Sequence, residues 1–191
     1  MDFENELIPG VLIKRYKRFF ADIKLKNKII TAHCPNPGSM FKLLKKNNPV
    51  WFTKSRNEKR KLKYTLQIIE VDGVKFCVNT HITNRVIQES LKNKLIKDLK
   101  SYDLIKSEKK FGQNTRFDFL LEDTKNSKKA FLEVKSVSLS RKKYHAEFPD
   151  SVTDRGKKHL VNLILARQQG YESYLIFLIQ IEKCKTFGIA S

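Results

Sequence analysis

The chain has 191 residues and a formal net charge of +19, from 39 Lys and Arg against 20 Asp and Glu. That length suits one large or two small domains with a real core. Three cysteines without a Cys-x-x-Cys pair indicate a reducing compartment and argue against a zinc site. The longest apolar run, 174–181, is too short to span a membrane, and the acidic N-terminus is unlike a signal peptide. We therefore expect a cytoplasmic protein with no membrane partner.

The positive charge predicts a polyanionic partner, because each phosphate that a protein neutralises releases counterions. A different origin is open as well. Of the 39 cationic residues 30 are Lys, and an AT-rich genome would produce that bias without any selection for binding. The ratio of Lys to acidic residues favours nucleic acid as the partner.

The first 80 residues predict short strands and turns. Strands are expected over 12–25, 28–34, 50–53, 64–71 and 74–79, with a hairpin turn at Asp72-Gly73. Five short strands in a segment of this length suit a small barrel, of which the OB-fold is the commonest five-stranded form.

A dense basic run lies between two of these strands. Its cationic residues are Lys54, Arg56, Lys59, Arg60, Lys61 and Lys63. Such loops of OB-folds commonly bind single-stranded nucleic acid, and the flanking Trp51, Phe52 and Tyr64 could supply stacking faces. A solvated loop beside core aromatics gives the same pattern, and spacing alone does not separate the two.

The second half of the chain predicts the order helix, three strands, helix, strand. A helix is expected over 84–96, capped by Thr83 or Asn84, and strands over 104–111, 116–121 and 130–138. A second helix over 153–169 ends at Gly170, and a buried strand follows over 171–181 as a parallel crossover. The apolar stripe of the second helix is expected to comprise Leu160, Val161, Ile164 and Leu165.

Three charged residues lie within two of these apolar strands: Asp118, Glu133 and Lys135. Burial of an unpaired charge is costly, so their positions need a reason. If the polar loop 122–129 closes symmetrically about Lys125 and Asn126, Asp118 lies opposite Glu133, and Lys135 shares the face of Glu133. Two close carboxylates with a lysine suit Mg²⁺ or Mn²⁺ and the hydrolysis of a phosphodiester. The alternative is a surface hairpin with a cross-strand ion pair.

Two further groups are weaker candidates. Glu89 could add a third metal-binding carboxylate, although the helical wheel places it away from the apolar face, where a solvated Glu is the ordinary result. Arg155, His159 and Asn162 form a polar stripe on the second helix that could face a phosphate or simply solvent.

Several motifs resemble those of the sugar fermentation stimulation protein A (SfsA) family, among them Ala-His-Cys-Pro-Asn-Pro-Gly-Ser-Met at 32–40. The other matching segments are 12–19, 78–80 with 84–85, 116–121 with 133–137, and 148–160. The resemblance implies an OB-like N-terminal domain, here 1–80, and a restriction-endonuclease-like PD-(D/E)xK domain, here 81–191, in an α+β or α/β fold. It also implies binding to DNA and a regulatory role in sugar (maltose) metabolism.

By the same resemblance Asp118, Glu133 and Lys135 take the places of the nuclease motif, and Glu89 that of an acidic residue on the first core helix. Arg155 and His159 lie where such folds often place a supporting polar residue. Phe117 stands where the motif has proline. The family's chains usually continue beyond the position of Ser191 with another helix and strand, so the sheet is expected to lack an edge strand.

Three functions are consistent with these observations. The first is a Mg²⁺-dependent nuclease in which Asp118, Glu133 and Glu89 hold the metal, Lys135 positions water, and the barrel holds single- or double-stranded DNA without sequence preference. The second is a non-catalytic, DNA-binding regulator of maltose-metabolism genes. The third is an RNA-binding module.

Overall fold

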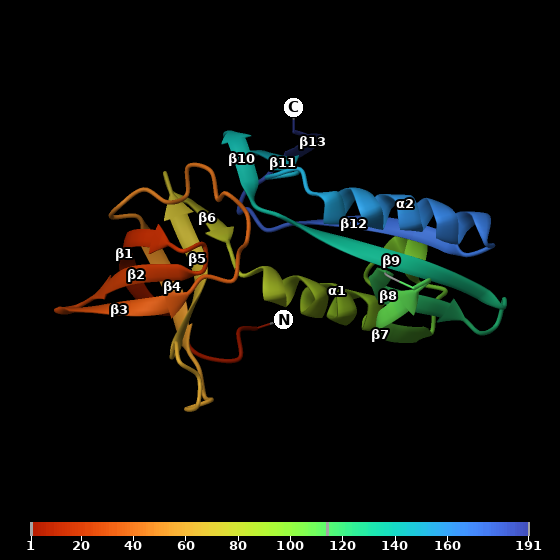
Figure 1. Cartoon of the computed structure of the whole chain (residues 1–191), viewed down its shortest axis with the longest axis horizontal. Coiled ribbons are helices and arrows are strands. Elements are labelled where there is room, and N and C mark those ends of the chain that lie inside the picture. The colour runs from red at the N-terminus through yellow and green to blue at the C-terminus, as the bar shows by residue number, and fades with distance from the viewer. Residues whose placement is uncertain (1, 114, 191) are drawn as a thin grey trace. The chain divides into compact units, whose positions relative to one another are not determined.

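The computed structural model describes residues 2–113 and 115–190. These residues form two compact units. We call the first the barrel unit; it contains 2–81, 136–151 and 179–190. The second, the sheet unit, contains the described residues of 82–135 together with 152–178 (Figure 1). Two late segments of the chain therefore belong to the same unit as residues 2–81.

The main sheet of the barrel unit has six strands in the order β3-β2-β1-β4-β5-β6. The strands are β1 (Ile8–Tyr16), β2 (Phe20–Leu25), β3 (Lys28–His33), β4 (Pro49–Lys54), β5 (Tyr64–Val71) and β6 (Val74–Cys77). β3 also pairs with β5 in parallel, so the first five strands close into a barrel. Closure removes the exposed edges of those strands. The expected OB-like barrel is confirmed.

One expected strand of the barrel unit is in fact two. The segment 12–25 turns back on itself, and β1 and β2 pair as antiparallel neighbours. Lys17 and Arg18 form the turn with φ of 45° and 62°, a conformation that lysine and arginine rarely adopt. Because this turn carries no Gly, Asn or Pro, it has no turn signal that sequence patterns could detect. The expected turn at Asp72-Gly73 is confirmed, with φ of 50° and 73°.

A small sheet of the barrel unit was not expected from the sequence. It joins β10 (Leu139–Lys142), β11 (His145–Phe148) and β13 (Thr186–Ile189). Each strand has four residues, too few for a clear alternation of apolar and polar side chains. Glu147, buried on β11, accepts hydrogen bonds from the guanidinium of Arg141 at 2.7 Å and from its backbone N–H at 3.0 Å.

The Arg141–Glu147 pair predicts an acid-sensitive contribution to folding. Its hydrogen bonds lower the pKa of Glu147 from an ordinary 4.5 to about 2. Because the folded-state pKa is depressed, this stabilisation is present above about pH 4.5 and declines as pH falls toward 2. In urea unfolding between pH 5 and pH 3, Glu147→Gln should lose less stability on acidification than the unaltered chain. Equal losses in the two proteins would contradict the assignment.

The sheet unit has two helices and a four-stranded sheet in the order β12-β9-β8-β7. Its elements are α1 (Thr83–Lys92), β7 (Leu104–Phe111), β8 (Thr115–Asp123), β9 (Lys128–Val137), α2 (Asp154–Gln168) and β12 (Glu172–Ile179), with 3-10 turns at Thr80–Ile82 and Lys97–Leu99. β7, β8 and β9 form an antiparallel meander. Lys128 pairs with Glu172 where β9 and β12 begin, and the Gln180 N–H donates to the Val137 carbonyl where they end. β12 is therefore parallel to β9, as expected for a crossover through α2 (Figure 1).

The helices cover opposite faces of this sheet. Ile87 and Leu91 of α1 pack with Phe119 and Leu132, whereas Leu163 of α2 packs with the cluster around Phe117. Among the described residues, no helix combines the length and apolar composition needed to cross a membrane.

The two helix starts differ in how well the sequence predicts them. The expected cap of α2 is confirmed, because Thr153 Oγ1 accepts a hydrogen bond from the Gly156 N–H at 3.0 Å. The expected cap of α1 is wrong. That helix continues directly from a 3-10 turn, the flanking residue is Ile82, and no side chain caps it. The amide of Asn84 is instead directed to the sheet.

The apolar stripe expected on α2 is not the face that the helix buries. Leu160, Val161, Ile164 and Leu165 are all more than 40% exposed, whereas His159, Leu163 and Ala166 are buried. When apolar side chains lie on more than one face of a helix, the spacing of apolar residues does not identify the face that is buried. Tertiary packing selects the face that carries His159.

Because α2 buries Leu163 and exposes Ile164, truncating these two neighbouring side chains should affect the free energy of unfolding differently. Leu163→Ala removes a side chain that is 7% exposed and should lower the free energy of unfolding by about 2–5 kcal/mol. Ile164→Ala, at a position 60% exposed, should change it by less than about 0.5 kcal/mol. Urea denaturation of both variants checks the contrast. A larger loss in Ile164→Ala would mean that the other face of α2 is the buried one.

Candidate metal and nucleic-acid site

The β8–β9 hairpin brings Asp118 and Glu133 to the end of its ladder. The ladder runs from Asp123 with Lys128 to Phe119 with Leu132, and Asp118 and Glu133 follow its last pair. This is the register that symmetric closure about Lys125 and Asn126 predicts. Direct opposition of the two carboxylates stays a prediction, because beyond the last pair the Val134 N–H donates to the Asp118 carboxylate.

Asp118 is anchored by two donors from different elements. Asn84 Nδ2 of α1 donates to Oδ1 at 2.7 Å, and the backbone N–H of Val134 donates to Oδ2 at 2.7 Å. The Asp118 carboxylate thus takes the Val134 N–H just beyond the last ladder pair of β8 and β9. Each oxygen keeps a second lone pair, so the fixed carboxylate retains capacity for another ligand.

β8 twists at Asp118. Phe117 and Phe119 are two residues apart, yet Phe117 packs in the α2 cluster and Phe119 in the α1 cluster. On the neighbouring β7, Glu108 has a φ of 54° and lies between the ladder pairs Ser107–Phe119 and Lys109–Phe117. The hydrophobic residues on either side of Asp118 therefore enter different cores and fix the strand on both sides of the carboxylate.

Glu133 is the most buried carboxylate of the site, with its side chain 4% exposed. Its Oε1 accepts a hydrogen bond from Lys135 Nζ at 2.6 Å and another from Nδ1 of His159. Because a carboxylate only accepts hydrogen bonds, His159 Nδ1 carries the proton. Oε2 is buried and has no hydrogen-bond partner among the described residues.

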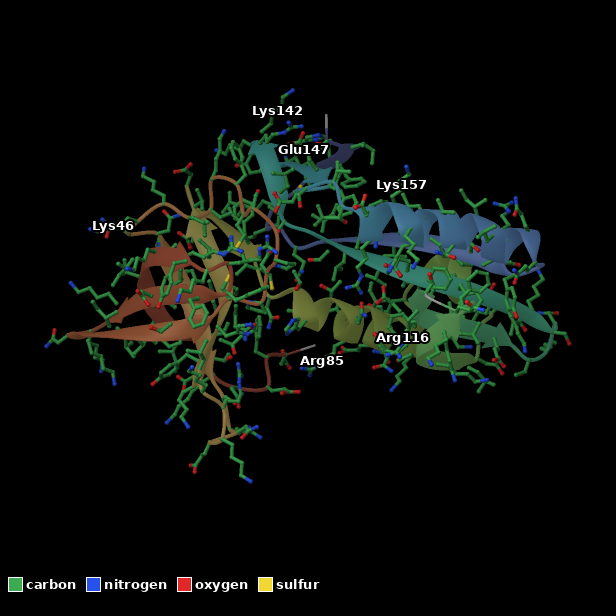
Figure 2. The ribbon with its side chains drawn as sticks, viewed as in Figure 1. Lys46, Arg85, Arg116, Lys142, Glu147 and Lys157 are labelled. Carbon is green, nitrogen blue, oxygen red and sulfur yellow. The ribbon has the colours of Figure 1, made fainter. Side chains whose placement is uncertain are left out.

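A cationic hollow lies beside His159. It has a volume of about 440 Å³ and is lined by Arg116, Asp154, Arg155, Lys158 and His159. Figure 2 shows Arg116 extending from the β8 side of the sheet unit. Three permanent cations against one carboxylate give this hollow the charge that a phosphate requires.

The structure does not bring all expected residues together. No three His, Cys, Asp or Glu side chains within 2–113 and 115–190 are grouped as a metal site, so Glu89 does not complete such a set with Asp118 and Glu133. Asn162 bonds to the Lys158 carbonyl of its own helix. His159 does enter the site. Its burial could not be read from the helical pattern, and Asn84 was expected only as a cap.

The basic loop of the barrel unit joins β4 to β5. Five of its expected cationic residues are exposed, and Arg60 is held by Thr65 Oγ1 at 3.2 Å. Phe52 is fully buried and meets Tyr64 edge-on at 5.4 Å between ring centroids. Phe52 is therefore a core residue and offers no stacking face. Trp51 is half-buried, with Lys75 over its ring.

Comparison with known proteins decides the family. The model of the sugar fermentation stimulation protein RE domain matches residues 81–191, and that of the SfsA N-terminal OB domain matches 13–78. The chain belongs to the SfsA family. A sugar fermentation stimulation protein homolog of Pelagibacter ubique is 54% identical over 190 residues, covering 100% of this chain and 81% of the relative. A homolog from a Ruegeria species is 43% identical, covering 100% and 83%.

A solved SfsA structure supports the same fold. Pyrococcus furiosus SfsA, in complex with Ca²⁺, superposes with a TM-score of 0.88 at 24% identity, covering 99% of this chain and 79% of that one. The fold is therefore an N-terminal OB domain with a restriction-endonuclease-like domain. The structural relative binds a divalent cation.

Proposed function

We propose that this SfsA chain is a divalent-metal-dependent nuclease acting on DNA, with its site at Asp118, Glu133 and Lys135. The observation that carries the proposal is Glu133 Oε2, which is buried without a hydrogen-bond partner among the described residues. A buried polar atom left unpaired costs about 1–3 kcal/mol. A cation at Oε2 would remove that cost.

The donor set fits Mg²⁺ or Mn²⁺. Both prefer oxygen ligands, and Mg²⁺ takes one or two carboxylates and keeps several waters. Glu133 Oε2 and the free lone pairs of Asp118 would hold the ion. Bound there, the ion would lower the pKa of water and polarise a phosphoryl oxygen. The Ca²⁺ of the Pyrococcus furiosus SfsA structure supports a site for this class of ion.

The protein's own residues would orient the two carboxylates and provide a positive charge next to the reacting phosphate. Asn84 and the Val134 N–H fix Asp118, and His159 holds Glu133 in its buried orientation. The Lys135 ammonium, 2.6 Å from Glu133, would orient the attacking water or offset charge that develops on the phosphate.

The neighbouring hollow would bind the substrate backbone. Arg116, Arg155 and Lys158 line it together with His159. Because His159 also contacts Glu133, phosphates held in the hollow would lie beside the carboxylate site. Phosphate contacts of this kind position DNA without reading its sequence.

A non-catalytic DNA-binding regulator of sugar metabolism is the second candidate. It is favoured by the absence of a three-ligand cluster among the described residues and by the two donors that already occupy Glu133 Oε1. Such a protein would use the cationic hollow and the β4–β5 loop for binding and would leave DNA intact.

Incubation of the purified chain with plasmid, linear duplex and single-stranded DNA separates the two candidates. The reactions contain Mg²⁺, Mn²⁺ or EDTA. The nuclease proposal expects cleavage of at least one substrate with metal and none with EDTA. Tight binding to every substrate with no cleavage under any metal condition would favour the regulator.

A further inference from the structure

The barrel unit contains a second cavity, of about 710 Å³, outside the carboxylate site. Its walls come from the segment 39–48, the β5–β6 turn and the β10–β11 hairpin, with Ile181 also contributing. This volume lies within the range of about 300–1,000 Å³ that is usual for ligand sites. The β4–β5 loop does not line it.

The rim of this cavity is cationic. Five of its lining residues are Lys or Arg: Lys42, Lys45, Arg141, Lys142 and Lys143. Among the described lining residues, Asp72 is the only acidic one. Arg141 is engaged by Glu147 at 2.7 Å, whereas the four lysines are exposed (Lys142 and Glu147 are labelled in Figure 2). The excess of positive charge selects an anionic occupant.

Two aromatic rings flank the same cavity. Phe41 is 49% exposed, and Tyr144 lies in the β10–β11 turn. Lys42 Nζ lies 5.3 Å from the centre of the Phe41 ring. Two lysines lie over the ring of Tyr144, with Lys143 Nζ at 5.0 Å and Lys185 Nζ at 5.6 Å from its centre. Both Lys42 and Tyr144 have positive φ, of 62° and 63°. Both positions therefore adopt a backbone conformation that these residue types rarely use.

The apolar residues that line the cavity indicate which class of anion it would bind. Val74, Phe76 and Ile181 give the cavity an apolar part beside its cationic rim. A nucleotide matches both, because its base offers a planar face for stacking and its phosphate a charge for lysine. An acidic peptide would use the lysines and leave the aromatic and apolar surface unmatched.

We propose that this cavity is a binding site for single-stranded nucleic acid, with a base stacked on Phe41 and backbone phosphates paired with Lys142 and Lys143. The proposal deepens the proposed function, since it assumes a nucleic-acid substrate, and it assigns single-strand recognition to this cavity of the barrel unit. Aromatic stacking tolerates any base, so the site should show little sequence preference.

Fluorescence anisotropy with a labelled 12-nucleotide oligo-dT, in EDTA and without divalent metal, tests the site. Phe41→Leu keeps an apolar side chain and removes the ring, and should weaken binding by about 5- to 100-fold. Lys142→Ala combined with Lys143→Ala should reduce the slope of log K against log[salt] by about 1.4. Lys24→Ala with Lys28→Ala, exposed on β2 and β3, removes the same charge elsewhere in the barrel unit and is the matched control.

The proposal is overturned if Phe41→Leu binds oligo-dT as the unaltered chain does, or if the Lys24 and Lys28 control loses as much affinity as the Lys142 and Lys143 variant. Tighter binding of a labelled deca-glutamate peptide than of oligo-dT would overturn it as well and identify an acidic peptide as the occupant. Thermal melting of each variant separates a local effect from unfolding. Because no metal is present, the outcome does not depend on cleavage, and a chain that never cuts DNA can still bind here.

Discussion

Glu133→Gln is expected to reduce metal-dependent DNA cleavage by a factor on the order of 10³, because a bound divalent ion supplies several kcal/mol of charge stabilisation and about 1.4 kcal/mol corresponds to tenfold. The amide keeps the size of the side chain but removes the charge beside the unpartnered Oε2 position. Lys135→Met should lower cleavage by about 10²- to 10⁴-fold, through loss of the group that acts on water. Rates of plasmid nicking in Mg²⁺ measure both effects.

The matched control is Glu122→Gln, which alters another glutamate of the same hairpin that also pairs with a lysine at 2.6 Å. Glu122 contacts Lys106 rather than the carboxylate site, so its cleavage rate should stay within about twofold of the unaltered chain. In EDTA, neither Lys135→Met nor Glu122→Gln should change the affinity for DNA. Full cleavage by Glu133→Gln would disprove the assigned site.

DNA affinity is expected to fall by about 10³- to 10⁵-fold between 50 and 200 mM salt, if 6–10 phosphates are contacted. The net charge of +19 and the cationic hollow at Arg116, Arg155 and Lys158 are the physical basis. Anisotropy titrations of a labelled duplex at several salt concentrations give the slope. The measurement uses EDTA so that cleavage does not interfere.

A paired variant locates the contacts. Arg155→Ala with Lys158→Ala should reduce the slope for duplex DNA by about 1.8, since each phosphate contact contributes about 0.9. Lys125→Ala with Lys128→Ala removes the same charge at the far end of the β8–β9 hairpin and should leave the slope nearly unchanged. A flat salt dependence of the unaltered chain would mean that its positive charge reflects composition rather than phosphate binding.

The local pattern was sufficient for the centre of the site. Strand side chains repeat every two residues, so a hairpin that closes about Lys125 and Asn126 has one register, and that register brings Asp118 and Glu133 to the end of the ladder. The same periodicity put Lys135 on the face of Glu133, and the two side chains do form an ion pair. Both predictions depend on neighbours a few residues apart in the chain.

Residues that reach the site from other elements were less predictable. His159 contacts a glutamate 26 residues earlier in the chain, and Asn84 bonds to a carboxylate 34 residues later. Helical periodicity favoured the side of α2 that carries Leu160 and Ile164, which the structure leaves exposed. Only packing of α2 on the sheet could decide which of two apolar faces is buried.

By itself, the sequence determined the barrel class, the turn at Asp72-Gly73, the register of the β8–β9 hairpin and the order of elements in the sheet unit, because each depends on local periodicity or turn chemistry. The tertiary structure alone decided that Asn84 and His159 complete the site, that Glu133 Oε2 is buried without a partner among the described residues, and that β10, β11 and β13 form a sheet. These features depend on contacts between residues distant in sequence, whose burial and pairing are set when helices and strands pack together.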